Sequence, residues 1–173
     1  MDFNFKFIQK ITVDGWQEKL KKCSVNDWNE YTFRQQEYTV HSETQTLPLM
    51  FNLGIEGKEN IQKKWFNFFK DELISVKEPL RKFYGHGNVI RAILVNLPAG
   101  AKIEPHVDGG DVFNRCHRVH LPIFTNEKCI FTVNEENLNL KEGELWEINN
   151  SSKFHGVVNY GQEDRIHLIV DWA

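Results

Sequence analysis

The sequence is poor in cysteine, carries little net charge and has no long apolar run. Its three cysteines, Cys23, Cys116 and Cys129, are an odd number without a Cys-x-x-Cys pair. A disulfide framework and a cysteine-based zinc site are therefore not expected, and reduced thiols fit a cytoplasmic protein.

Other absences narrow the expected partners. The N-terminus has neither the basic start nor the apolar core of a signal peptide, and no stretch reaches the length of a membrane span. A formal net charge of −3 lacks the basic surplus of a general nucleic-acid binder. Neither a membrane nor nucleic acid is expected as a partner.

Aromatic side chains are abundant instead. Phenylalanine occurs 13 times and tryptophan 5 times, so large planar groups are expected to fill much of the interior. The length of 173 residues predicts one domain, residues 1–173. Within it we expect a mixed helix and strand lead-in over residues 1–87 and a strand-rich core with the site over residues 88–173.

The beginning of the chain carries mixed periodicity. Alternation from Phe3 to Phe7 predicts an opening strand with one buried face, and Asp14 is a candidate cap for a short helix that extends toward Cys23. The weak pattern of residues 24–43 predicts irregular structure or short strands. Residues 46–51 are expected to form a strand, in which Pro48 favours an edge position.

The strongest helical pattern runs from Lys58 to Tyr84. Apolar residues return there at intervals of three and four, which predicts a stripe facing a core, and we interpret this stripe as scaffold. Pro79 is expected to break or kink the helix, with Gly85 as its C-terminal cap. A turn is expected at Gly54 and Gly57, before the helix.

Short strands separated by turn signals fill the second half. The expected strands are Val89–Leu97, Lys102–Asp108, Cys116–Thr125, Cys129–Val133, Leu138–Leu140, Glu144–Ile148, Phe154–Asn159 and Arg165–Trp172. This close spacing is typical of a sandwich or a barrel.

Ionisable residues interrupt three of these strands on the face that should be apolar. Because alternate residues share a face, the pairs that point together are His106 with Asp108, Arg118 with His120, and Arg165 with His167. Each such group would cost several kcal/mol to bury alone. One shared site that pairs them is the simplest explanation.

The order His106-x-Asp108 followed by His155 predicts a metal site. Two imidazoles and one carboxylate can hold one face of an Fe(II) ion and leave the opposite positions open. Zinc accepts the same ligands. The arginines Arg118 and Arg165 favour iron, because they suggest a dicarboxylate co-substrate beside the metal.

Several other residues are given less specific interpretations. His41, His86 and His117 are interpreted as ordinary core or surface histidines. Trp146 fits either a core position or the wall of a cavity. The loop Gly109-Gly110-Asp111, with Asn114 and Arg115 nearby, is either a cover for the substrate or an ordinary solvated loop.

Five spaced motifs resemble the aspartyl/asparaginyl β-hydroxylase family, over residues 89–173. They are His106-Val-Asp108, Arg118-Val-His120-Leu-Pro-Ile, Glu142-Gly-Glu-Leu-Trp146, His155-Gly-Val-Val-Asn159 and Arg165-Ile-His-Leu-Ile-Val-Asp171. The resemblance implies a mainly β fold with bracing helices (α+β), namely a double-stranded β-helix, which is a cupin-like jelly roll.

The resemblance also implies a chemistry. It implies an Fe(II)- and 2-oxoglutarate-dependent dioxygenase that uses O2 to hydroxylate an unactivated C–H bond. The iron ligands would be His106, Asp108 and His155. Arg165 would pair with the distal carboxylate of 2-oxoglutarate, and Arg118 and His120 would contact the same co-substrate.

The substrate is less constrained. The animal hydroxylase of this family lacks the ligand carboxylate, whereas this chain has Asp108 at the matching position, like many bacterial members. Some bacterial relatives hydroxylate free amino acids. A small molecule or a peptide is therefore the expected substrate. Two alternatives stay open: a metal-binding cupin-like module without oxygenase activity, and a zinc or manganese cupin isomerase or hydrolase. Loss of a metal ligand or of Arg165 would favour the first alternative, and neither is lost. Thermal stabilisation by 2-oxoglutarate would separate the second alternative from the dioxygenase.

Overall fold

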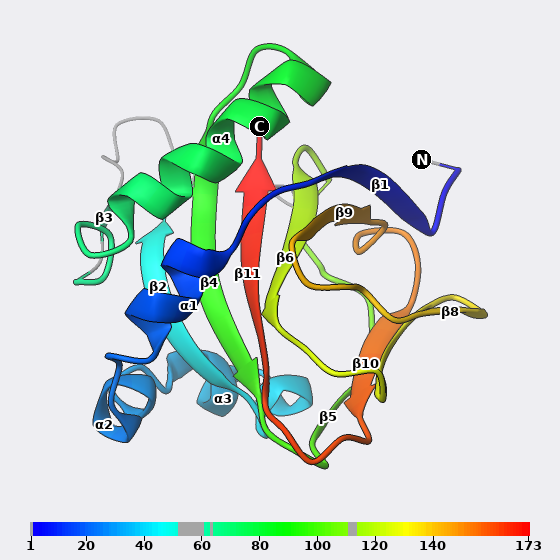
Figure 1. Cartoon of the computed structure of the whole chain (residues 1–173). Coiled ribbons are helices and arrows are strands. Elements are labelled where there is room, and N and C mark those ends of the chain that lie inside the picture. The colour runs from blue at the N-terminus through cyan, green and yellow to red at the C-terminus, as the bar shows by residue number, and fades with distance from the viewer. Residues whose placement is uncertain (1, 52–60, 63, 111–113) are drawn as a thin grey trace.

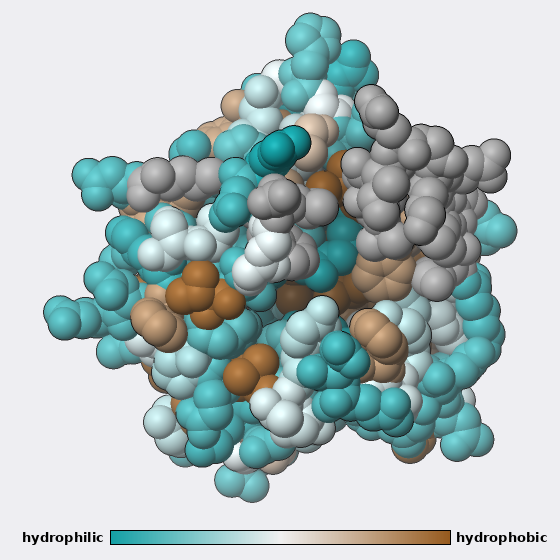
Figure 2. Space-filling view, turned by 180° about the vertical axis from the view of Figure 1, so that it is seen from behind, coloured by the Kyte–Doolittle hydropathy of each residue, from teal (hydrophilic) through white to brown (hydrophobic). Residues whose placement is uncertain are grey.

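The fold is built from two antiparallel β-sheets that face each other, with helices against the larger one (Figure 1). This computed structural model describes residues 2–51, 61–62, 64–110 and 114–173. Among these residues, no helix combines the length and the apolar character that crossing a bilayer needs. The face seen in Figure 2 is mainly hydrophilic, and its hydrophobic residues stand in small separate groups.

The larger sheet has seven strands in the order β1-β9-β6-β11-β4-β2-β3. Their bounds are β1 Phe5–Lys10, β2 Gln45–Phe51, β3 Ile61–Gln62, β4 Val89–Leu97, β6 His117–Phe124, β9 Glu144–Ile148 and β11 Arg165–Trp172. The smaller sheet has the order β5-β10-β7-β8, with β5 Lys102–His106, β7 Cys129–Val133, β8 Glu136–Leu138 and β10 His155–Asn159. The double-stranded β-helix implied by the resemblance is confirmed.

The two faces of the larger sheet have different coverings. The helices α1 (Asp14–Leu20) and α4 (Lys70–Tyr84) cover one face, where they share the main hydrophobic core with β2, β4, β6 and β11. The smaller sheet covers the other face. Strand alternation therefore sends Val119 and Leu121 of β6 to the helices and Arg118 and His120 to the space between the sheets.

Three expectations for the lead-in need correction. The opening strand exists, but Phe7 is 47% exposed, so β1 has no fully buried face. Asp14 is the first residue of α1 and makes no capping hydrogen bond, and the helix ends before Cys23. Residues 24–43 form helices instead of strands: α2 Val25–Asn29, α3 Phe33–Glu37 and the 3-10 helix η1 Thr39–His41.

The long helix is also shorter than its periodicity predicts. It begins at Lys70, and Ile61–Gln62 form β3. Pro79 lies inside α4 without ending it, because Leu73, Val76 and Leu80 are buried around it. Each such side chain contributes about 1.5–3 kcal/mol on burial, which together exceeds the cost of about 3 kcal/mol for an interior proline.

The sequence analysis also predicted a helix end at Gly85 and a turn at Gly54 and Gly57. Gly85 ends α4 as expected, with φ of +86° and its N–H donating to the carbonyl of Arg81. Gly54 and Gly57 lie outside the described residues. β2 lies between β4 and β3 in the sheet order, so the predicted edge position of this strand is wrong. Pro48 lies opposite Ile93 of β4, and the described residues of β3 pair with Met50 and Phe51.

Candidate metal centre

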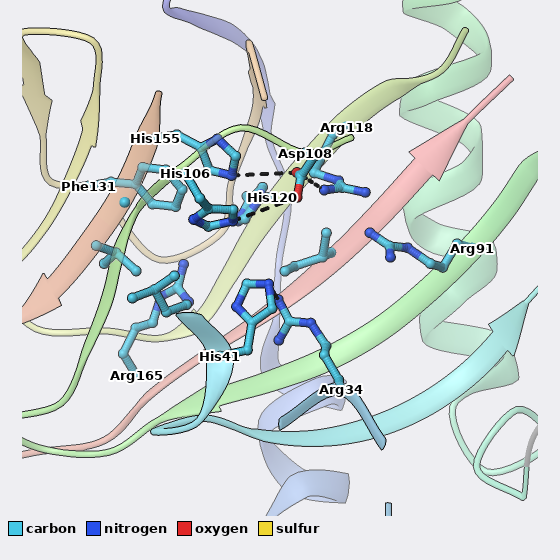
Figure 3. A pocket seen from close by; sticks show the side chains of 14 residues that line it. Arg34, His41, Arg91, His106, Asp108, Arg118, His120, Phe131, His155 and Arg165 are labelled. Atoms are coloured by element: carbon cyan, nitrogen blue, oxygen red, sulfur yellow. Dashed lines mark hydrogen bonds and ion pairs between the residues drawn. The ribbon is translucent and has the colours of Figure 1, made fainter. Parts of the chain in front are cut away.

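A cavity between the two sheets contains the predicted metal ligands (Figure 3). His106 ends β5, Asp108 follows two residues later, and His155 begins β10. Antiparallel pairing of β5 with β10 places the two histidines directly opposite each other, with ring centroids 4.3 Å apart. The register of the smaller sheet therefore brings together residues that are far apart in the sequence.

The three side chains form a compact cluster. The Nε2 atom of His106 lies 3.7 Å from Oδ1 of Asp108, and the Nε2 atom of His155 lies 3.5 Å from Oδ2. One nitrogen or oxygen of each residue lies within 4.8 Å of the others. Two imidazole nitrogens and one carboxylate oxygen can thus coordinate one ion from one side.

Hydrogen bonds hold both imidazoles in the tautomer that a metal requires. Nδ1 of His106 lies 2.8 Å from the carbonyl oxygen of Glu104, and Nδ1 of His155 lies 3.5 Å from that of Lys153. Since a carbonyl only accepts, each Nδ1 carries the proton and each Nε2 offers a lone pair to the cluster. Burial also lowers the pKa of His155 to about 4, which keeps this ring neutral at pH 7.

Asp108 is held as a carboxylate by two neighbours. Arg118 donates to Oδ2 of Asp108, and the side-chain amide of Asn150 donates to the same oxygen over 2.9 Å. The main-chain N–H of Asp108 also donates to the carbonyl of Asn150, over 2.9 Å. Burial opposes ionisation, but the charge of Arg118 outweighs it and holds the pKa of Asp108 well below its usual range.

Arg118 is itself fixed by a second carboxylate. Its Nε and Nη2 donate to the two oxygens of Asp171 over 2.7 and 2.9 Å. Asp171 is 1% exposed and also forms an ion pair with Arg91, whose Nε lies 2.7 Å from Oδ2 of Asp171. The resemblance implies that Arg118 contacts the co-substrate, whereas here its guanidinium joins two protein carboxylates and positions Asp108.

Arg165 lies deep in the same cavity and pairs with no carboxylate of the described residues. It is 1% exposed, and Nη2 lies 2.5 Å from Nδ1 of His167. Its buried Nε has no hydrogen-bond partner among the described residues. Burial lowers the pKa of Arg165 to about 10, so the group remains a cation at neutral pH, without a carboxylate partner in the described part of the chain. His120 and Phe131 line the cavity nearby.

Residues that the sequence analysis did not assign to the site complete the cavity. Arg34 and His41 reach it from α3 and η1, and Arg91 from β4. His41, interpreted from sequence as an ordinary histidine, is buried and lines the cavity. Trp146 is absent from the lining and packs on Phe7 instead.

The donor set suits a divalent transition metal. Two imidazoles whose Nε2 atoms face the cluster, one ionised carboxylate and an adjacent buried cation with no carboxylate partner among the described residues fit an Fe(II) ion with an acidic co-substrate. The bracing of Asp108 is of the kind that tunes metal affinity from outside the ligand set. Of the loop interpreted as a cover or an ordinary solvated loop, Asp111 lies outside the described residues.

Replacing Asn150 with alanine is expected to weaken metal binding by about 10–100-fold, because the mutation removes one of the two side-chain hydrogen bonds that orient Oδ2 of Asp108. Competition titration of Fe(II) or Zn(II) with a chromophoric chelator measures the effect. Asn139→Ala is the matched control, since Asn139 donates to two main-chain carbonyls of Asn126 and Cys129 and is not part of the cluster. Equal metal affinity in the two variants would refute the positioning role of Asn150.

The fold and the cluster define a class. A double-stranded β-helix with two histidines and one aspartate in its cavity is typical of non-haem Fe(II) oxygenases. A sequence model of the family described as "Aspartyl/Asparaginyl beta-hydroxylase" matches residues 76–173, more than half of the chain. The chain belongs to the aspartyl/asparaginyl β-hydroxylase family, as the sequence resemblance predicted.

Solved structures share the fold at low sequence identity. A Burkholderia pseudomallei oxidoreductase of the 2OG-Fe(II) oxygenase family is 11% identical with a TM-score of 0.59, covering 75% of this chain and 66% of its own. A Pseudomonas putida prolyl-4-hydroxylase is 11% identical with a TM-score of 0.57, covering 99% and 92%. The collagen prolyl hydroxylase of Paramecium Bursaria Chlorella virus-1 is 7% identical with a TM-score of 0.57, covering 99% and 96%.

Proposed function

We propose that the chain is an Fe(II)- and 2-oxoglutarate-dependent dioxygenase that hydroxylates an unactivated C–H bond of an amino acid, a peptide or a similar small molecule. One observation carries the proposal: a cluster of two histidines and one aspartate shares a cavity with a buried arginine that pairs with no carboxylate of the described residues. Family membership supports it. So does the likeness to a viral prolyl hydroxylase whose structure is a 2-oxoglutarate complex.

The metal would be held by His106, Asp108 and His155. Fe(II) with 2-oxoglutarate and O2 supplies the chemistry, in which decarboxylation to succinate and CO2 is coupled to insertion of one oxygen atom into a C–H bond. These three residues would hold the ion from one side, which would leave room in the cavity for the co-substrate and O2.

Arg165 would bind the distal carboxylate of 2-oxoglutarate. A guanidinium can donate two parallel hydrogen bonds to a carboxylate, and its depth in the cavity excludes competing water. His120, whose pKa burial lowers far below the usual value, stays neutral beside this co-substrate. Arg118 holds Asp108 in place for the metal.

The proposal includes a small or peptide substrate and a cytoplasmic location. The neighbouring prolyl hydroxylases support the substrate class, since one such enzyme from Trichoplax adhaerens was solved with a peptide fragment. The three free cysteines, two of them buried, support a reducing compartment.

Arg165→Ala is expected to weaken 2-oxoglutarate binding by about 100-fold, the loss of two charge-assisted hydrogen bonds. Arg165→Lys is expected to recover only part of the affinity, because an ammonium group cannot form the paired contact. The measurement is anaerobic titration of the Fe(II) protein with 2-oxoglutarate, followed by the visible charge-transfer band. Arg81→Ala, on the exposed side of α4, is the control.

The same titration tests the ligand set. His155→Ala is expected to lose the band together with the iron. If wild-type protein binds iron but gives no band with 2-oxoglutarate, the dioxygenase proposal fails, and a metal-binding module without oxygen chemistry takes its place.

A further inference from the structure

The cavity contains more positive charge than the proposed cofactors neutralise. Four guanidinium groups line it, those of Arg34, Arg91, Arg118 and Arg165. Among the described residues, the carboxylates that contact them are Asp108 and Asp171. In the described part of the chain, two of the four guanidinium charges, those of Arg34 and Arg165, therefore have no carboxylate partner. Fe(II) and the dianion of 2-oxoglutarate cancel each other, so both bound together leave this excess unchanged.

The excess can be traced to particular residues. Arg118 contacts both carboxylates, and Arg91 contacts Asp171. Arg34 and Arg165 pair with no carboxylate in the described part of the chain. One carboxylate of 2-oxoglutarate is needed at the metal and the other at Arg165, so the co-substrate has no further anion to offer Arg34.

Arg34 is held in place by neutral partners. Its Nη2 lies 3.1 Å from Nε2 of His41, and its Nη1 lies 3.5 Å from Oγ1 of Thr44. The Thr44 hydroxyl donates to the carbonyl of His41 over 2.7 Å, so it is oriented to accept from Arg34. These contacts fix the guanidinium without neutralising it.

His41 adds a second donor to the same place. Because arginine only donates, Nε2 of His41 must accept, and the imidazole proton therefore lies on Nδ1. Nδ1 is buried and has no hydrogen-bond partner, and His41 is only 8% exposed. The His41 ring lies 5.0 Å from that of His106, next to the metal cluster. In Figure 3, Arg34 and His41 lie together on the opposite side of the cavity from His155.

We propose that Arg34 and His41 form a second anion site, which binds a carboxylate of the primary substrate and directs its C–H bond toward the metal. The inference rests on the proposed function and adds the chemical class of the substrate. Arg34 lies outside residues 76–173, which the family model matches. The specificity would therefore come from the lead-in, while the metal and co-substrate sites belong to the matched region.

The test compares acids with their uncharged analogues. The probes are free α-amino acids, their carboxamides, and short peptides that end in a carboxylate or a carboxamide. Succinate formation by the Fe(II)·2-oxoglutarate protein is measured with each probe. Probes with a free carboxylate are expected to stimulate succinate formation and their carboxamides are not. The comparison of amino acids with peptides identifies which source of carboxylate is used.

Arg34→Gln is expected to raise KM for the stimulating acid by about 100-fold, as for loss of a charge-assisted pair, without changing the 2-oxoglutarate affinity from the charge-transfer band. Arg34→Lys is expected to recover part of the loss. Arg81→Gln, an exposed arginine of α4, is the matched control.

Three outcomes would overturn this inference while the band is present. They are carboxamides that stimulate as well as acids, a panel in which no carboxylate stimulates, and an Arg34→Gln variant whose affinity for 2-oxoglutarate falls with that for substrate. Absence of the band in the wild-type protein would instead overturn the proposed function, and this inference with it.

Discussion

Replacing Asp171 with asparagine is expected to lower the free energy of unfolding by about 3 kcal/mol, the loss that follows removal of one partner from a buried ion pair. The substitution keeps the shape of the side chain but leaves Arg118 and Arg91 without the carboxylate between them. We expect this loss of stability to lie in the lower part of the range that is usual for a broken buried ion pair, because the Arg91 side chain is 21% exposed and retains some hydration. Chemical denaturation of the metal-free protein measures the change.

The same substitution should also weaken metal binding, since Asp171 orients the arginine that orients Asp108. Asp71→Asn is the matched control. Asp71 is exposed in the first turn of α4, where loss of one charge costs less than about 1 kcal/mol. An Asp171→Asn variant that unfolds at the same denaturant concentration as Asp71→Asn would contradict this account of the buried pair.

The strands of the second half could be predicted closely because they carry a local signal. β4 and the predicted strand share the bounds Val89–Leu97, and β11 begins and ends where Arg165–Trp172 was expected. Alternation between apolar residues and ionisable residues such as Arg118 and Arg165 marks which face lies toward the cavity. A pattern with a period of two is readable without knowing which strands pair.

The lead-in was harder to predict because its structure depends on contacts that are distant in sequence. Ser24 and Asp27 form a capping box, and their spacing was a readable signal for α2. Nothing comparable marks α3, whose five residues have no buried member. The position of Arg34 in the cavity follows from packing of the lead-in on the sheets, which no local period encodes.

The site itself was predictable in part. The cluster of His106, Asp108 and His155 assembles as expected. The ion pairs between the arginines and the carboxylates could not be predicted, because the partner of each guanidinium depends on the strand register. Arg118 lies opposite Asp171 only because β6 pairs with β11. The sequence analysis did not include Asn150 in the site, because its contact with Asp108 is visible only in three dimensions.

The metal-free protein is expected to lose stability steeply as the pH falls below about 6, because several buried histidines are held neutral. Burial lowers the pKa of His41 to about 2 and that of His155 to about 4, and it keeps the pKa values of His120 and His167 well below the usual range. In the unfolded chain these histidines have a pKa of about 6.5. The unfolded state therefore binds more protons than the native state in this window, and acid favours unfolding.

Each of the four histidines contributes a slope of about 1.4 kcal/mol per pH unit once the unfolded form is protonated, or about 5 kcal/mol per unit together. Since a domain of this size has about 5–15 kcal/mol of stability, the apoprotein is expected to unfold within a few pH units below neutrality. Urea denaturation at successive pH values measures the slope. His167→Asn, which keeps an acceptor for Arg165, should reduce the slope by about a quarter, and His86→Asn changes an exposed histidine as the control. An unchanged slope in His167→Asn would mean that His167 is not held neutral in the folded protein.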